Sequence, residues 1–196
     1  SIEVRNGAIV NSITNEGELD FAKIEVSDVG TTVEDIKNTG TINMGSSSTG
    51  LAGINIEDGA QVGTITNTGF IEAGNRFAIL IDDTASVTQI NNAGTINGRV
   101  DFGINGGFYN SSGGVSGEVF NATSLQIGAA ETGVAGPLVT KINGNFSFSG
   151  PMTFEAKGFD GGVRYGQLAT TGNAAVNGAL TINVSGETFF SNNDVL

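Results

Sequence analysis

The stretch IKNTGTIN at residues 36–43 recurs along the chain, as ITNTGFIEAG from Ile65 and INNAGTING from Ile90. Five copies align on a first aliphatic residue, which is Ile13, Ile36, Ile65, Ile90 and Val119. Two residues later every copy carries an asparagine, at Asn15, Asn38, Asn67, Asn92 and Asn121. Another aliphatic residue follows at offset six, and the first four copies carry glycine at offset four. Residues an even number apart share one face of a β-strand, so the repeat predicts strands with one buried face.

The copies follow one another too closely for each to be a domain, and each has room for about three short strands. A unit of that size cannot bury its own apolar face, but stacked copies bury it against one another. If each copy forms one coil, equivalent strands pair in parallel and their aliphatic side chains make one continuous core. We therefore predict an all-β, right-handed parallel β-helix of about five coils over residues 1–136. The unequal coil lengths disfavour a left-handed form built from hexapeptide repeats.

The asparagines and glycines of the repeat have different structural explanations. A column of stacked asparagine amides hydrogen-bonds from one coil to the next, so we expect a structural ladder of Asn15, Asn38, Asn67, Asn92 and Asn121. A binding role for these amides is the alternative. Glycine permits either a positive φ or a close approach of two backbones, and a corner of the coil requires one of the two.

Composition excludes several classes of function. The chain has no cysteine and no histidine, so disulfides, thiolate or imidazole metal sites and histidine-dependent triads are all excluded. Eight Lys and Arg against 20 Asp and Glu give a formal net charge of −12, and the few cations form no cluster in the sequence. We therefore expect no nucleic-acid partner. The first residues lack the pattern of a signal peptide, and we expect the sequence to be a segment of a longer chain.

One acidic group stands out, because Glu57 and Asp58 align with Asp82 and Asp83 of the next copy. Carboxylates stacked in this way could hold Ca²⁺, or act as the acid and nucleophile of a glycosidase. The alternative is that EDG and DDT are ordinary turns, in which the carboxylate accepts hydrogen bonds from its own backbone. We favour turns, and we expect no cofactor other than a possible Ca²⁺ at these four residues.

A longer connection is predicted at INGGFYNSSGG, residues 104–114. Its glycines place Phe108 and Tyr109 on a loop, where two aromatic side chains could contact a ligand. The alternative is that both rings fold back over the coil.

The repeat stops near Pro137, but alternation of apolar and polar residues continues to the end of the chain. We predict a C-terminal β module over residues 137–196 that caps the open end of the coil, because an uncovered end exposes strand edges and core. The stretch YGQLATTGNAAVNGALTINV at residues 165–184, together with the upstream NTGTI repeats, resembles the C-terminal stalk of bacterial autotransporter passenger domains, which ends in the pertactin-like or autochaperone region. The residues that carry the resemblance in this module are Tyr165, Gln167, Leu168, Gly172, Gly178 and Leu180.

This resemblance implies a secreted, non-enzymatic stalk on the bacterial cell surface. It implies export through the outer membrane by a C-terminal translocator barrel of the same polypeptide, and a C-terminal module that promotes passenger folding. The expected role is virulence-related adhesion or self-association, with a host surface or a neighbouring bacterial cell as partner. The alternative is a carbohydrate-active β-helix enzyme, a polysaccharide lyase or glycosidase, that uses the acidic group.

Overall fold

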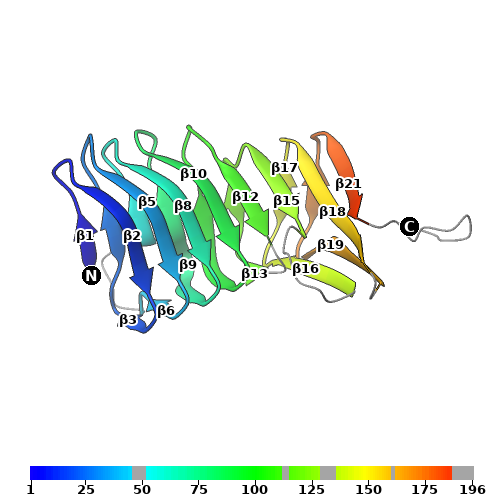
Figure 1. The fold of residues 1–196 in the computed structure, drawn as a ribbon, viewed down its shortest axis with the longest axis horizontal. Coiled ribbons are helices and arrows are strands. Elements are labelled where there is room, and N and C mark those ends of the chain that lie inside the picture. Colours follow the sequence, from blue (N-terminus) through cyan, green and yellow to red (C-terminus); the bar gives the residue numbers. More distant parts are fainter. Residues whose placement is uncertain (46–51, 112–114, 129–135, 160–161, 187–196) are drawn as a thin grey trace, which may run out of the picture.

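A computed structural model describes residues 1–45, 52–111, 115–128, 136–159 and 162–186 of the 196-residue chain. These residues form strands β1 to β21, and no helix occurs among them. The strands stack along one axis, so that the first and last coils lie at opposite ends of an elongated molecule (Figure 1). None of the described segments is a helix long and apolar enough to cross a membrane.

The first column contains one strand from each coil, and every neighbouring pair is parallel and in register. Its members are β2 (Ile9–Asn15), β5 (Thr32–Asn38), β8 (Gln61–Asn67), β10 (Ser86–Asn92), β12 (Phe108–Ser111), β15 (Ser124–Ile127), β18 (Met152–Phe159) and β21 (Leu180–Gly186). The stacked strands make a β-solenoid of about seven turns. The parallel β-helix predicted from the repeat is therefore confirmed, with more turns than expected.

Two further columns complete the coil. The second column contains β3 (Glu18–Asp20), β6 (Thr41–Asn43), the first halves of β9 (Phe70–Ile81) and β11 (Thr95–Asp101), β13 (Val115–Ser116), β16 (Gly136–Ile142) and β19 (Gly162–Thr170). The third contains β1 (Ile2–Val4), β4 (Ile24–Val26), β7 (Ala52–Ile56), the second halves of β9 and β11, and β14 (Val119–Phe120). A separate parallel pair joins β17 (Phe146–Phe148) and β20 (Ala174–Val176), and β18 and β19 also pair as an antiparallel hairpin at their adjoining ends.

The core lies inside the coil and is built from the aliphatic columns of the repeat. Ile36, Ile65 and Ile90 pair directly with one another across β5, β8 and β10, and each is fully buried. Burying one such side chain contributes about 1.5–3 kcal/mol. Because each coil supplies residues to the same columns, every added coil extends this core without changing its cross-section.

The predicted alignment of the fifth copy of the repeat with the isoleucine column is wrong. Tyr109, not Val119, continues the isoleucine column, because β12 pairs Tyr109 with Ile90. Val119 belongs to the third column, where it pairs with Val100. Fewer residues separate Ile90 from Tyr109, and Tyr109 from Leu125, than separate equivalent residues of the earlier coils. An alignment that expects the longer spacing therefore misses the coil that contains Tyr109.

The parallel columns continue across the boundary predicted at residue 136. Strand β16 pairs with β13 on one side and with β19 on the other, so residues 137–159 and 162–186 add further coils to the same solenoid. Strand β21 belongs to the last described coil, and its side chains are exposed; Leu180 retains 62% of its accessible surface and Ile182 retains 58%. Within the described residues this segment therefore forms the end of the stack. Its predicted capping role stays a prediction.

The glycines at offset four of the repeat are needed because two backbones approach closely there, and not because the residue has an unusual φ. Gly40, Gly69 and Gly94 are not among the residues with positive φ. A Cβ atom built on Gly69 would lie 2.1 Å from the carbonyl oxygen of Gly40, and one on Gly94 would lie 2.2 Å from that of Gly69. Gly17 in the first coil has nothing within 4 Å of such an atom. The coils therefore stack at this turn only because the side chain is missing.

We predict that Gly69→Ala destabilises the solenoid by about 1–3 kcal/mol, because the added methyl group overlaps a backbone atom that cannot rotate away. Gly17→Ala provides the matched control and is expected to change stability by less than about 0.5 kcal/mol. Urea denaturation followed by circular dichroism measures both. Equal midpoints for the two variants would contradict the close-packed turn.

Candidate functional site

Four of the repeat asparagines form a continuous hydrogen-bonded column inside the coil, here called the asparagine ladder (Asn15, Asn38, Asn67 and Asn92). The Nδ2 of Asn15 donates to Oδ1 of Asn38 at 2.8 Å, Asn38 donates to Asn67 at 2.8 Å, and Asn67 donates to Asn92 at 3.0 Å. All four side chains are buried. Asn38, Asn67 and Asn92 thus each accept from the coil before and donate to the coil after.

The ladder also binds the backbone of the following strand column. The Nδ2 of Asn38 donates to the carbonyl oxygen of Phe70 at 3.2 Å, and that of Asn67 donates to the carbonyl oxygen of Thr95 at 3.3 Å. One amide therefore connects its own strand with the equivalent strand of the next coil and with the strand that follows the turn in that coil. Buried polar groups are stable only when they are hydrogen-bonded, and this geometry uses both the donor and the acceptor of the side chain.

Tyr109 ends the ladder, and it is not the loop residue that was predicted. It lies in β12 and is fully buried, and its hydroxyl accepts a hydrogen bond from Nδ2 of Asn92 at 3.3 Å. Burial raises the pKa of Tyr109, against the smaller opposing effects of Ser116 and Asn92. Only Phe108, with 52% exposure, keeps a ring at the surface. The predicted aromatic ligand loop is therefore wrong for Tyr109, because alternation in the strand sends the two neighbouring side chains to opposite faces.

Asn121 lies outside the ladder. It is exposed in a turn with a φ of 58°, and its Nδ2 donates to Oδ1 of Asp101 at 2.7 Å. Asparagine tolerates this left-handed conformation better than most residues. Its occurrence two residues after Val119 follows from turn chemistry, which the repeat alignment did not distinguish from the ladder.

The acidic residues at 57, 58, 82 and 83 lie in turns at one corner, where the carboxylates of Glu57, Asp82 and Asp83 accept hydrogen bonds from N–H groups. The backbone N–H of Asp58 donates to Oδ2 of Asp82 at 3.0 Å, and Nδ2 of Asn55 donates to Glu57 at 2.7 Å. Oδ1 of Asp83 accepts from the backbone N–H of Ile104 at 3.2 Å. These contacts are those of turns. Within the described ranges no three acidic side chains are grouped so as to hold a metal ion, and binding of Ca²⁺ stays a prediction.

Asp82 has the most hydrogen bonds at this corner. Its Oδ1 accepts from the backbone N–H groups of Thr84 and Ala85 and from the hydroxyl of Thr84, each at 2.7–2.8 Å. Burial acts to raise the pKa of Asp82, but the combined hydrogen bonds from Thr84, Asp58 and Ala85 lower it below its ordinary value. The carboxylate therefore stabilises the turn in its charged form.

The residues predicted to form a folding module lie in the last coils. Tyr165, Gln167 and Leu168 belong to β19, and Leu180 begins β21. Gly172 and Gly178 lie between strands, and a Cβ atom on Gly178 would be 1.8 Å from the carbonyl oxygen of Gly150. These two glycines thus continue the close stacking seen in the first coils.

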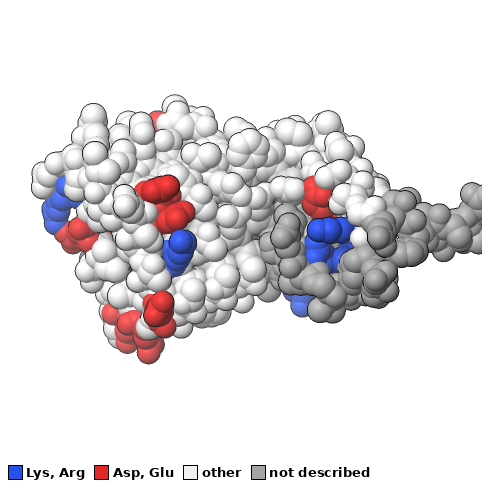
Figure 2. All heavy atoms as spheres, in the orientation of Figure 1, with Lys and Arg blue, Asp and Glu red and all other residues white. Residues whose placement is uncertain are grey.

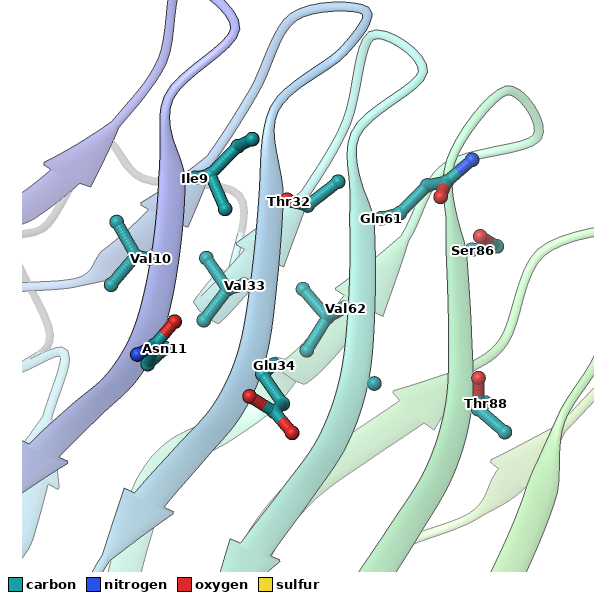
Figure 3. A pocket seen from close by; sticks show the side chains of 11 residues that line it. Ile9, Val10, Asn11, Thr32, Val33, Glu34, Gln61, Val62, Ser86 and Thr88 are labelled. Carbon is teal, nitrogen blue, oxygen red and sulfur yellow. The ribbon is translucent and has the colours of Figure 1, made fainter.

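A shallow groove crosses the first column near the starts of β2, β5, β8 and β10 (Figure 3). Its volume is about 310 Å³, and its walls come from four successive coils. Thr32, Gln61, Ser86 and Thr88 offer hydroxyl and amide groups, and Glu34 is the charged residue in the lining. Most of the same face is uncharged, but acidic and basic side chains gather over its N-terminal half (Figure 2). The groove suits weak polar contact better than acid–base chemistry, since catalysis needs a second titratable group.

Comparisons with protein families, curated proteins and solved structures find no match. The function is therefore inferred from the structure of the chain itself.

We predict that Asn67→Ala lowers the free energy of unfolding by about 2–4 kcal/mol, because it removes the buried hydrogen bonds that Asn67 accepts from Asn38 and donates to Asn92. Asn121→Gly is the control, since glycine adopts the positive φ and only a surface hydrogen bond is lost; we expect a change below about 0.5 kcal/mol. Urea midpoints compare them. A large loss in Asn121→Gly with none in Asn67→Ala would contradict the ladder as observed.

The lowered pKa of Asp82 predicts that the stability of the fold depends on pH. Because its folded-state pKa lies below the ordinary value of 3.8, its contribution is complete above that value and is lost as pH falls through the lowered pKa. Asp82→Asn is therefore expected to unfold at a lower temperature near neutral pH and to lose less stability than the parent on acidification. Glu34→Gln removes one negative charge away from this corner and serves as the control. Parallel melting curves for parent and Asp82→Asn down to about pH 2 would contradict the turn's dependence on this carboxylate.

Proposed function

We propose that the chain is a structural, surface-displayed stalk, a passenger segment of a bacterial autotransporter that holds an adhesive or self-associating surface away from the cell. On this proposal the coil is right-handed, the stalk is exported through a translocator barrel, and residues 137–196 promote folding and cap the coil. The partner is a host surface or a neighbouring bacterial cell.

The observation that carries the proposal is the continuous parallel pairing of the first column from β2 to β21. Each coil contacts mainly its neighbours, so the structure extends a surface over distance with a short repeated sequence. Such a fold can form stepwise, one coil on the edge of the previous one, which suits a chain that emerges unfolded from a narrow pore. The absence of cysteine favours the same route, because a disulfide would obstruct threading.

The C-terminal coils are suited to begin this process. In strand β18 the residues Met152 to Gly158 pair with β21 over its whole length, and β16 pairs with β19 from residue 136 to residue 142. Both pairings span seven residues, as do the pairings between β2, β5, β8 and β10 of the first coils. A segment that folds first needs extensive pairing of its own before it can act as an edge for the next coil.

The experiment fuses the chain to a translocator barrel and measures protease accessibility at the cell surface. Gly178→Val places a branched side chain against the backbone of Gly150, and we expect it to reduce surface display several-fold and to slow refolding of the isolated chain. Gly17→Val is the control, because the first coil offers open space at that position.

Equal display of the two variants, with unchanged refolding rates, would contradict a folding role for the C-terminal coils. Turnover of a polysaccharide by the parent chain, lost in Asp58→Ala or Asp83→Ala, would contradict a purely structural stalk.

A further inference from the structure

Strand β9 bulges outward beside β11 at the turn between the second and third columns. Glu72 pairs with Asn97 and Phe77 pairs with Arg99, so residues 73–76 of β9 lie opposite the single residue Gly98. Gly98 has a φ of 146°, and a Cβ atom there would lie 2.9 Å from Cβ of Ala73. The bulge can pack in this position only beside glycine. Irregularities of this kind often redirect side chains at functional sites.

The bulge separates two adjoining cavities of about 430 and 450 Å³, both of which are lined by Gly74 and Asn75. We call the larger one the bulge cleft; its polar lining consists of Asn75, Asn97, Arg99, Glu118 and Asn143. Four successive coils contribute to it. Its volume falls within the range of roughly 300–1,000 Å³ that small-molecule sites occupy.

Arg99 is held in a fixed position at this cleft. Its guanidinium carbon lies 4.4 Å from the centre of the Phe77 ring, and one terminal nitrogen donates to the carbonyl oxygen of Asn75 at 3.1 Å. The Nε atom is buried and has no hydrogen-bond partner within the described chain. Stacking on an aromatic ring orders the side chain before any ligand arrives, which reduces the entropy cost of binding.

No ion pair joins Arg99 to a carboxylate among the described residues, although Glu118 lines the same cleft. In a protein with a formal net charge of −12 this is an unusual local environment. The neighbouring groups are hydrogen-bonding ones: Nδ2 of Asn97 donates to both oxygens of Glu72 at 2.8 Å, which leaves its Oδ1 as an acceptor. Asn143 is exposed and half-buried Glu118 adds a further acceptor.

We propose that the bulge cleft binds a sugar that carries a carboxylate, with Arg99 pairing with the carboxylate and the amides and Glu118 bonding to hydroxyls. Arginine offers two parallel N–H groups to a carboxylate, and amides provide both donors and acceptors for hydroxyl groups. Glu118 and the overall negative charge repel a doubly charged phosphate more strongly than a singly charged carboxylate, and Arg99 is the one cation among the described residues that line the cleft. The site stands independently of the display role, because it is a property of the folded chain alone.

The experiment titrates the ¹⁵N-labelled chain with three probes and follows the amide resonances of the cleft residues. Glucuronic acid carries both hydroxyls and a carboxylate, glucose lacks the carboxylate, and acetate lacks the hydroxyls. We expect glucuronic acid to shift the resonances of Asn97, Glu118 and Asn143 and to bind at least tenfold more tightly than either of the other probes. Equal affinities for glucuronic acid and glucose, or for glucuronic acid and acetate, would overturn the proposal.

Single substitutions test which residues of the bulge cleft bind the sugar. Arg99→Gln is expected to remove the preference for glucuronic acid over glucose, and Arg99→Lys to restore part of it, since the charge returns without the planar pair of donors. Arg5→Gln, at an exposed arginine of the first coil, is the matched control and should bind as the parent does. Asn143→Ala changes an exposed side chain outside the core and should weaken binding several-fold, so the proposal is testable even if Arg99→Gln fails to fold. Unchanged affinity in both Arg99→Gln and Asn143→Ala would overturn it.

Discussion

The structure depends on one constraint, that equivalent residues of successive coils lie directly above one another. Parallel pairing fixes the rise per coil at about 4.8 Å, and it repeats whatever the first coil presents. An isoleucine therefore meets an isoleucine, as at Ile36 and Ile65, and an amide meets an amide, as at Asn38 and Asn67. Apolar columns are tolerant of small slips, but hydrogen-bonded amides are not. The asparagine ladder thus gives the first coils a register that hydrophobic burial alone would specify weakly.

The same constraint explains why some positions accept no side chain. At the turn after the ladder the backbones of neighbouring coils approach so closely that Gly40, Gly69 and Gly94 are required by space. Backbone hydrogen bonds hold these backbones close, because the N–H of Phe70 donates to the carbonyl oxygen of Gly40 and that of Thr95 donates to the carbonyl oxygen of Gly69, each at 2.9 Å. Asn38 and Asn67 also bond to carbonyl oxygens beyond this turn. Asparagine and glycine therefore recur together because the same turn of each coil uses both.

Much of this could be predicted from the sequence, because a repeat with even offsets has few explanations other than stacked strands. Ile36, Ile65 and Ile90 lie in the predicted column. The prediction failed where a coil kept its place in the stack but changed its residues. Tyr109 replaces an isoleucine and Ser111 replaces an asparagine in a coil of different length, so pattern matching found Val119 and Asn121 instead. The bulge cleft was also missed, because Arg99 and Phe77 meet only through a register shift that no sequence pattern records.

The interior of the solenoid changes at Tyr109, from hydrogen-bonded amides in the N-terminal coils to apolar side chains in the C-terminal coils. Beyond the ladder the equivalent positions are Ser111, Ile127, Phe154 and Ile182, so the column passes from amides to apolar side chains. Apolar side chains can collapse early without exact partners, whereas an amide ladder gains its full stabilisation only when each amide meets an amide already in place. If the C-terminal coils form first, Tyr109 presents the first fixed hydroxyl to Asn92, and each later coil then meets a correctly placed partner. The order of residues along the chain therefore fits growth from the C-terminal end better than growth from the N-terminal end.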